Sequence, residues 1–154
     1  MNNPLNLALD LRVHTLGIHP LLFLACPYSH PDRMVRAHRA LLASDMTARL
    51  MGQGYGVFSP ISHGHAVCEA DMTVTIGTDA ASWSVVNDRV MHLCNALVVL
   101  DIPGLWESLG VRREVSLAAK YHQIPINLIR SNGNGLEVEP GIDPMLFSDG
   151  EGRL

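Results

Sequence analysis

The 154-residue sequence has few charged and few aromatic residues, 17% and 5% respectively, and its only lysine is Lys120. The net charge of −4 and the scattered arginines give no basic patch, which argues against a nucleic-acid partner. No apolar run approaches the ~20 residues of a membrane span, so we expect no membrane partner. Almost half of the residues are apolar, and the length suits one domain with a substantial core.

Cysteines are also few. Cys26, Cys68 and Cys94 are widely spaced and form no Cys-x-x-Cys pair, which argues against a disulfide scaffold or a zinc ribbon. Buried thiols in a reducing compartment are the simplest interpretation, and they predict a cytoplasmic protein. The sequence also lacks a GxxxxGK[ST] motif and a GxGxxG motif after its first strand, so we expect no P-loop chemistry and no bound cofactor.

Apolar runs alternate with segments of helical spacing along most of the chain. This alternation predicts a three-layer α/β domain of flavodoxin-like or Rossmann-like type with a mainly parallel sheet. The predicted strands lie at about 21–26, 55–59, 96–102 and 124–129, and the predicted helices at about 33–51, 79–94 and 108–121.

The two ends of the chain carry weaker patterns than this core of about 21–130. Residues 1–20 are predicted to form a short amphipathic helix or an arm, which Gly17 and Pro20 would end. Residues 131–154 are rich in Gly, Asp and Glu and predict an irregular tail. We treat the whole of 1–154 as one domain.

Polar loops follow the predicted strands at their carboxyl ends. They are Tyr28–His30 after the first strand, Ser59–His65 after the second and Gly104–Ser108 after the third. Parallel sheets bind ligands beyond the carboxyl ends of their strands, so we expect these loops to share one rim.

Three kinds of chemistry are possible at this rim. His30, His63 and His65 could bind zinc together with Cys26 or Cys68, but polar pocket histidines explain them better, and we expect no metal. Cys26 or Ser29 could act as a nucleophile with a histidine, but a cysteine that ends a buried strand is more often inert. A carboxylate could act in glycosidic-bond chemistry, and the sequence offers Glu114 for this role.

Glu114 belongs to a distinctive stretch, Ser108-Leu-Gly110-Val-Arg-Arg-Glu114, that follows a buried strand and a short loop. A helix that begins with Ser and Gly leaves free backbone N–H groups at its first turn, where an anion or a sugar hydroxyl can bind. Glu114 lies about one and a half turns further on and could reach the same corner.

Three motifs of this chain resemble the nucleoside 2-deoxyribosyltransferase-like superfamily, in particular an uncharacterised bacterial and phage branch. They are Leu-Ala-Cys-Pro-Tyr28-Ser29-His30, Phe-Ser59-Pro-Ile-Ser-His63 and Ser108-x-Gly110-Val-x-x-Glu114. The third also resembles nucleotide N-glycoside hydrolases. The resemblance spans about residues 21–130 and implies a flavodoxin-like sheet in a homodimer or higher homo-oligomer.

The resemblance also implies roles for single residues. Glu114 would attack or stabilise C1′ of a (deoxy)ribose, with Asp101 as its supporting acid, and Ser108 would bind the 5′ end. Tyr28, Ser29 and His30 would contact the sugar or the base. The predicted substrate-binding residues are Tyr28, Ser29, His30, Ser59, His63, Asp88, Gly104, Ser108 and Gly110.

The expected function is cleavage or transfer at the N-glycosidic bond of a small-molecule nucleoside or nucleoside monophosphate, with Glu114 as the nucleophile. Two alternatives remain open at this stage. One is a nucleotide-sensing module of the same fold that has lost turnover, and the other is a metal-dependent hydrolase that uses the histidines.

Overall fold

The computed structural model describes residues 3–10, 19–71, 73, 76–77 and 80–148. Its elements follow one another as β1 (Leu21–Ala25), α1 (Arg33–Gly52), β2 (Gly56–Phe58), α2 (Pro60–Ala70), α3 (Ala80–Met91), β3 (Ala96–Leu100), α4 (Leu109–Leu117), a π-helical turn (Ala118–His122), β4 (Ile126–Ser131), β5 (Leu136–Glu139) and a 3₁₀ turn (Pro144–Phe147). Among the described residues, no helix is both long and apolar enough to cross a membrane.

The strands form one sheet in the order β2-β1-β3-β4-β5. The first four strands pair in parallel, and β5 runs antiparallel to β4. The order reverses between β1 and β3, which makes their carboxyl ends the switch point of the sheet. The predicted α/β class and its mainly parallel, flavodoxin-like sheet are therefore confirmed.

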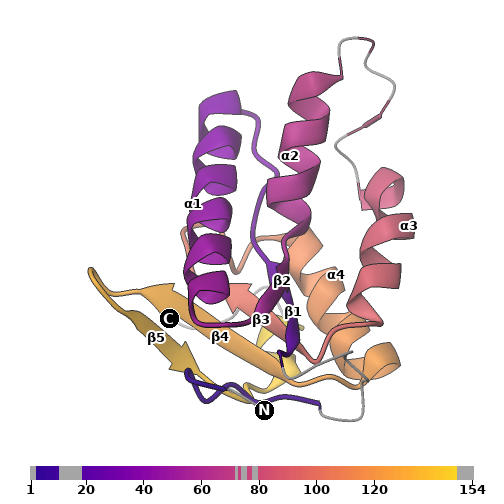
Figure 1. Ribbon diagram of the computed structural model, residues 1–154. Coiled ribbons are helices and arrows are strands. Elements are labelled where there is room, and N and C mark those ends of the chain that lie inside the picture. The colour runs from indigo at the N-terminus through magenta and orange to yellow at the C-terminus, as the bar shows by residue number, and fades with distance from the viewer. Residues whose placement is uncertain (1–2, 11–18, 72, 74–75, 78–79, 149–154) are drawn as a thin grey trace.

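Helices cover both faces of the sheet, and its central strands, β1 and β3, are apolar at every position. β1 turns Leu22 and Leu24 toward α1, and it turns Phe23 and Ala25 toward α4. All of β3 is buried. Parallel strands buried on both faces have continuous apolar runs of this kind. The three layers are visible in Figure 1, where α1 stands on one side of the sheet and α4 on the other.

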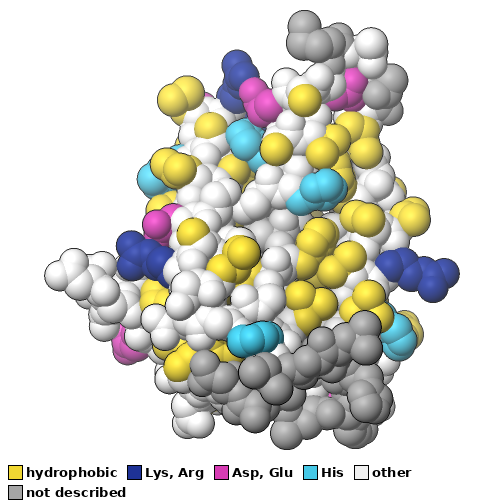
Figure 2. All heavy atoms as spheres, viewed as in Figure 1, with side chains coloured by type: hydrophobic (Ala, Val, Ile, Leu, Met, Phe, Trp, Pro, Cys, Tyr) yellow, Lys and Arg dark blue, Asp and Glu magenta, His cyan; other side chains and the backbone are white. Residues whose placement is uncertain are grey.

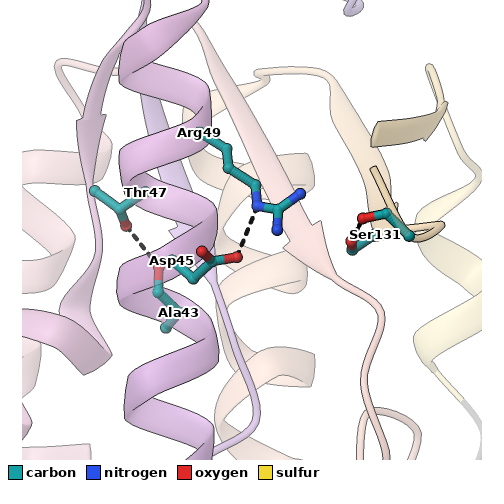
Figure 3. A network of polar contacts seen from close by, with 6 residues as sticks. Ala43, Asp45, Thr47, Arg49 and Ser131 are labelled. Atoms are coloured by element: carbon teal, nitrogen blue, oxygen red, sulfur yellow. Dashed lines mark hydrogen bonds and ion pairs between the residues drawn. The ribbon is translucent and has the colours of Figure 1, made fainter. Parts of the chain in front are cut away.

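The longest helix, α1, begins at the cap residue Asp32, whose side chain accepts a hydrogen bond from the Met34 amide. On the exposed face of α1, Arg49 Nε lies 2.8 Å from Asp45 Oδ2, and on the opposite side of the helix Thr47 Oγ1 donates to the Ala43 carbonyl (Figure 3). Hydrophobic side chains are interspersed with the few charged ones on the surface that the helices present (Figure 2).

Of the two alternatives predicted for the start of the chain, the described residues 3–10 form the arm and no helix. The arm begins with a turn at residues 4–5, and further on the Ala8 amide and carbonyl both bond to the Asn127 side chain. Leu7 of this arm is buried in the core. The side chain of Asn95 holds the backbone of Asp10 and Leu21 in the same way. Residues 11–18, including the predicted end at Gly17, lie outside the described residues.

The segment after residue 130 is not an irregular tail over its described part. It forms β5, which pairs with β4, and a 3₁₀ turn that buries Phe147. The Phe147 and Trp106 rings pack at a centroid distance of 5.0 Å, and Ile142 joins the same core cluster. Leu136 and Val138 alternate with two glutamates, as in a strand with one buried face.

The buried Phe147 predicts a loss of stability when this turn is weakened. We expect Phe147→Ala to lower the free energy of unfolding by about 3 kcal/mol, because it leaves a cavity beneath Trp106. Urea unfolding followed by tryptophan fluorescence measures this loss. Met145→Ala, in the same turn but 66% exposed, is the matched control and should change stability by less than about 0.5 kcal/mol. Equal effects of the two changes would contradict the packing.

The segment at about 61–66, expected to be a loop, is the first half of α2. Ser59 caps this helix by accepting from the Ser62 amide, and Pro60 occupies its first turn, where a missing N–H costs nothing. Gly64 weakens the helical pattern, and it lies against α3: a Cβ at this position would be 3.7 Å from the Trp83 ring, an ordinary van der Waals contact. The predicted helix at 79–94 corresponds to α3, which is shorter than expected, and Asp79, at the predicted start of this helix, lies outside the described residues.

Candidate active site

A cavity of about 630 Å³ opens at the switch point, beyond the carboxyl ends of β1 and β3. The loop after β1, the loop after β3 and helices α1 to α4 contribute its walls. This volume lies within the range of about 300–1,000 Å³ that small-molecule sites have. The lining residues that carry the following argument are Tyr28, Arg39, Trp83, Asn87, Ser108 and Glu114.

Glu114 is placed in the cavity by the capping of α4. Ser108 Oγ accepts from the Val111 amide at 3.3 Å, which starts the helix, and Val111 and Val115 are buried against the sheet. Glu114 is adjacent to Val115 on the helix and reaches the cavity wall. Part of its surface remains accessible from the cavity, yet burial is the main influence on its carboxyl and raises its pKa to about 8.

An ion pair next to Glu114 joins α3 to α4. Arg113 donates to both carboxylate oxygens of Asp88, at 2.9 and 2.8 Å. Such a two-point bond fixes the relative position of two helices better than a single contact does. Arg113 lowers the pKa of Glu114 and Asp88 raises it, and both effects are smaller than that of burial.

The loop after β1 is held against α2 by a bond between two side chains. Tyr28 Oη lies 2.8 Å from His65 Nδ1, and the two rings meet edge to face. Burial raises the pKa of the Tyr28 hydroxyl, and nearby Cys68 adds to this shift. His30 is engaged differently, because its Nδ1 accepts a hydrogen bond from the Asp32 amide. Both residues line the cavity.

Arg39 of α1 connects the two loops that flank the switch point. Its guanidinium donates to the Ser29 carbonyl at 3.0 Å and to the Tyr28 carbonyl at 3.4 Å on one side. On the other side it donates to the Pro103 carbonyl at 3.2 Å. Gly104 makes room for this contact: its φ is +95°, and a Cβ there would lie 2.1 Å from Arg39 Nη2.

This contact predicts different costs for two glycine substitutions. Gly104→Ala and Gly133→Ala both place an alanine at a positive φ, but only the first would collide with a side chain, since nothing lies within 4 Å of a Cβ at Gly133. We expect Gly133→Ala to cost about 1 kcal/mol of unfolding free energy. We expect Gly104→Ala to cost about 1–2 kcal/mol more, because Arg39 loses its bond to Pro103.

Urea unfolding of the two variants measures this difference, and a double-mutant cycle with Arg39→Ala assigns it. In that cycle Gly104→Ala should cost less once Arg39 is absent, because the collision is gone. Equal costs for the two glycines, or strict additivity with Arg39→Ala, would show that the loops are held in another way.

Seven of the eleven predicted site residues come together around the cavity. They are Tyr28, Ser29, His30, Gly104, Ser108, Gly110 and Glu114. The other four are not among its lining residues.

These four residues have other partners. Ser59 is buried as the cap of α2, and His63 packs against the Phe58 and Trp83 rings. Asp88 is bound to Arg113 beside Glu114. Asp101, the predicted supporting acid, directly follows β3, and its Oδ2 lies 3.5 Å from Nε of Arg130 in β4.

The lining residues that sequence reasoning missed include three polar ones on helices: Arg39, Asn87 and Arg113. Arg39 and Arg113 lie on helices whose arginines have no distinctive spacing, so no local pattern separates them from solvent-exposed arginines. Asn87 is next to Asp88, which was predicted, and it occupies the same face of α3 as Trp83, four residues earlier. Only the packing of α3 shows that Asn87, rather than Asp88, lines the cavity.

The thiols and histidines show no sign of the alternative chemistries among the described residues. Cys26 is buried, and burial raises its pKa to about 12, with Glu114 adding to this shift, so it is a poor nucleophile. Its Sγ donates to the Pro27 carbonyl. Within the described ranges, no three His, Cys, Asp or Glu side chains are grouped so that they could hold a metal ion.

A family model described as Domain of unknown function (DUF1937) matches residues 20–129. No curated protein matches the chain. The matched range contains all the residues that line the cavity, whereas β5 and the 3₁₀ turn with Phe147 lie beyond it.

Proposed function

The chain belongs to the DUF1937 family of domains of unknown function, and from the chemistry of its cavity we propose that it is an enzyme of N-glycosidic bonds. Its substrate would be a (deoxy)nucleoside or a nucleoside monophosphate, and its product a free base with either the sugar or a new nucleoside. The observation that carries the proposal is the carboxyl of Glu114 in the wall of a ligand-sized cavity, one and a half turns after the start of α4. The three motifs that resemble the nucleoside 2-deoxyribosyltransferase-like superfamily support it.

In the proposed reaction, the ionised Glu114 attacks C1′ of the sugar. A bond forms between a carboxylate oxygen and C1′ while the bond from C1′ to the base nitrogen breaks. The base leaves with that electron pair and takes up a proton. A water molecule, or a second base, then attacks C1′ and releases Glu114 as a carboxylate. Two displacements at the same carbon retain its configuration.

The first turn of α4 would bind the 5′ end of the substrate. Ser108, Leu109 and Gly110 line the cavity, and the first backbone N–H groups of a helix have no partners within the helix. They can therefore donate to a phosphate or to a hydroxyl, and the helix dipole favours the anion. Arg39 adds positive charge to the same cavity.

The direct test is release of free base. The protein is incubated with a panel of nucleosides and their 5′-monophosphates, in ribose and 2′-deoxyribose forms, and the products are separated by chromatography. We expect one class of substrate to yield free base, with a sugar or sugar phosphate as the second product. A panel that stays intact over long incubation at protein concentrations near that of the substrate would refute the proposal.

A nucleotide-binding module without turnover is the second candidate. The observation that favours it is that Asp101, the predicted supporting acid, lies beside Arg130, while Asp88, beside Glu114, binds Arg113. Calorimetry discriminates the two functions. Saturable binding of a nucleotide, without base release under the same conditions, would establish the binding module.

We further propose that the protein acts in the cytoplasm as a homodimer or a higher homo-oligomer. The free, buried Cys26 and Cys94 support a reducing compartment. The oligomer rests on the family resemblance, and light scattering coupled to size-exclusion chromatography measures it. A strictly monomeric mass at working concentrations would refute this part.

A further inference from the structure

The wall of the cavity contains a polar atom that lacks a partner. Asn87 Oδ1 is the one side-chain nitrogen or oxygen that is fully buried without a hydrogen bond, among the residues that the structure describes. Asn87 lines the cavity, as does Trp83 one turn before it on the same face of α3. A buried amide oxygen without a hydrogen bond is rare in folded proteins, and each one calls for an explanation.

The position of Asn87 is well defined, so the missing bond does not come from a loose helix. The next residue, Asp88, is held to Arg113 by two hydrogen bonds that tie α3 to α4. On its other side α3 packs through Trp83 against Gly64 of α2. Asn87 and Glu114 therefore face one cavity from two helices that are fixed to each other.

We propose that Asn87 determines substrate specificity: its amide rotates so that Oδ1, which is closed to solvent in the ligand-free protein, accepts a hydrogen bond from an N–H or O–H group of the substrate. This inference rests on the proposed function, because it assigns a contact within the same cavity. The amide oxygen is an acceptor only, so the matching group of the substrate is a donor. Two parts of a nucleoside carry such donors: the amino or imide N–H of the base, and the 2′-hydroxyl of a ribose.

The consequence is discrimination against substrates that lack the donor. A substrate without it leaves Oδ1 unpaired and gains nothing, whereas a substrate with it satisfies a buried acceptor. Sites built around a buried polar group reject analogues in this way. We expect a tenfold to hundredfold difference in affinity between matched substrates with and without the donor.

Binding is measured by calorimetry in a Glu114→Gln background, which prevents turnover, with and without Asn87→Ala. The probes are matched pairs of nucleoside monophosphates. One arm compares each ribonucleotide with its 2′-deoxy form, and the other compares each base with its N-methylated form. We expect one arm to show the difference with Asn87 present and to lose it in Asn87→Ala, while ligands without the donor bind both proteins equally.

The ligand-free protein offers a second, independent readout. Asn87→Leu keeps the branched shape of the side chain, with larger groups beside an open cavity, and removes the unpaired oxygen, so we expect it to unfold at a higher urea concentration than the parent. If the Asn87 amide stabilised the fold, Asn87→Leu would instead unfold at a lower urea concentration than the parent. Stabilisation without ligand, combined with loss of discrimination, is the pattern that a binding role produces and a structural role does not.

The outcomes separate this inference from the proposed function. If ligands bind but Asn87→Ala leaves both arms unchanged, or weakens all ligands equally, the assignment of Asn87 is wrong and the proposed function stands. If Asn87→Leu destabilises the ligand-free protein, the assignment is also wrong. If no probe binds the parent and the wild-type protein releases no base, both are refuted.

Discussion

Glu114→Gln is expected to lower kcat/KM for base release at least about a thousandfold. Glutamine has nearly the same shape, but its amide cannot form the bond to C1′ that replaces the bond to the base. The chromatographic assay with the best substrate of the panel measures this loss. The wild-type kcat/KM should also fall as the pH drops below about 8, because a smaller fraction of Glu114 is then ionised.

The matched control for this loss is Glu137→Gln, which removes a carboxylate from the exposed side of β5, away from the cavity. Its kcat/KM should equal that of the wild type. Circular dichroism and calorimetric binding of the same substrate show whether Glu114→Gln is folded and still occupied. A folded Glu114→Gln variant that keeps more than about a tenth of the wild-type rate would exclude Glu114 as the nucleophile.

The second large effect concerns stability and depends on pH. We expect Glu114→Gln to raise the free energy of unfolding at pH 9 by on the order of 4 kcal/mol, and by less than about 1 kcal/mol at pH 5. The pKa of Glu114 rises from 4.5 in the unfolded chain to about 8 in the fold, because the buried site disfavours the carboxylate. Glutamine is neutral at every pH and avoids this cost.

The direction follows from proton binding. Between pH 4.5 and about 8 the folded protein binds more protons than the unfolded chain at this residue, so wild-type stability falls as the pH rises through this window. Below 4.5 both states are protonated, and the contribution of Glu114 to the pH dependence disappears. Urea unfolding of both proteins at pH 5, 7 and 9 measures the divergence.

The control is again Glu137→Gln, which should run parallel to the wild type over the same pH range. If the curves of Glu114→Gln and wild type also run parallel, burial does not disfavour the carboxylate of Glu114. That result would refute the stability prediction but not the activity prediction, because a carboxylate without a raised pKa can still be the nucleophile. A stabilised but inactive variant is what we expect of a residue kept for function at the expense of stability.

The local sequence pattern was sufficient to predict the centre of the fold. The apolar runs at about 21–26 and 96–102 could be recognised as buried strands because both of their faces are covered, which leaves no polar position to confuse the pattern. The helix that starts at Ser108 was recognisable from its cap. Because parallel strands end at one edge, Tyr28 and Ser108 could be assigned to the same rim before any contact was known.

Local pattern failed where packing overrides propensity. The first half of α2 has a glycine and two histidines among its residues and looks like a loop, yet Ser59 caps a helix there and Gly64 lies against the Trp83 ring of α3. β5 is short and follows a glycine-rich turn, and its alternation of Leu136 and Val138 with glutamates becomes decisive only when β4 offers an edge to pair with.

The stretch from Ser108 to Glu114 shows most clearly which features follow from local sequence and which depend on packing. The sequence by itself determined that a capped helix follows a buried strand and carries a carboxyl near its first turn, since spacing and capping are local properties. Only the tertiary structure decided which groups face that carboxyl. It placed Arg113 and Asp88 beside Glu114, directed Asp101 to Arg130, joined the loops through Arg39, and left Asn87 without a partner. Each of these contacts joins separate elements, and their distances depend on how those elements pack.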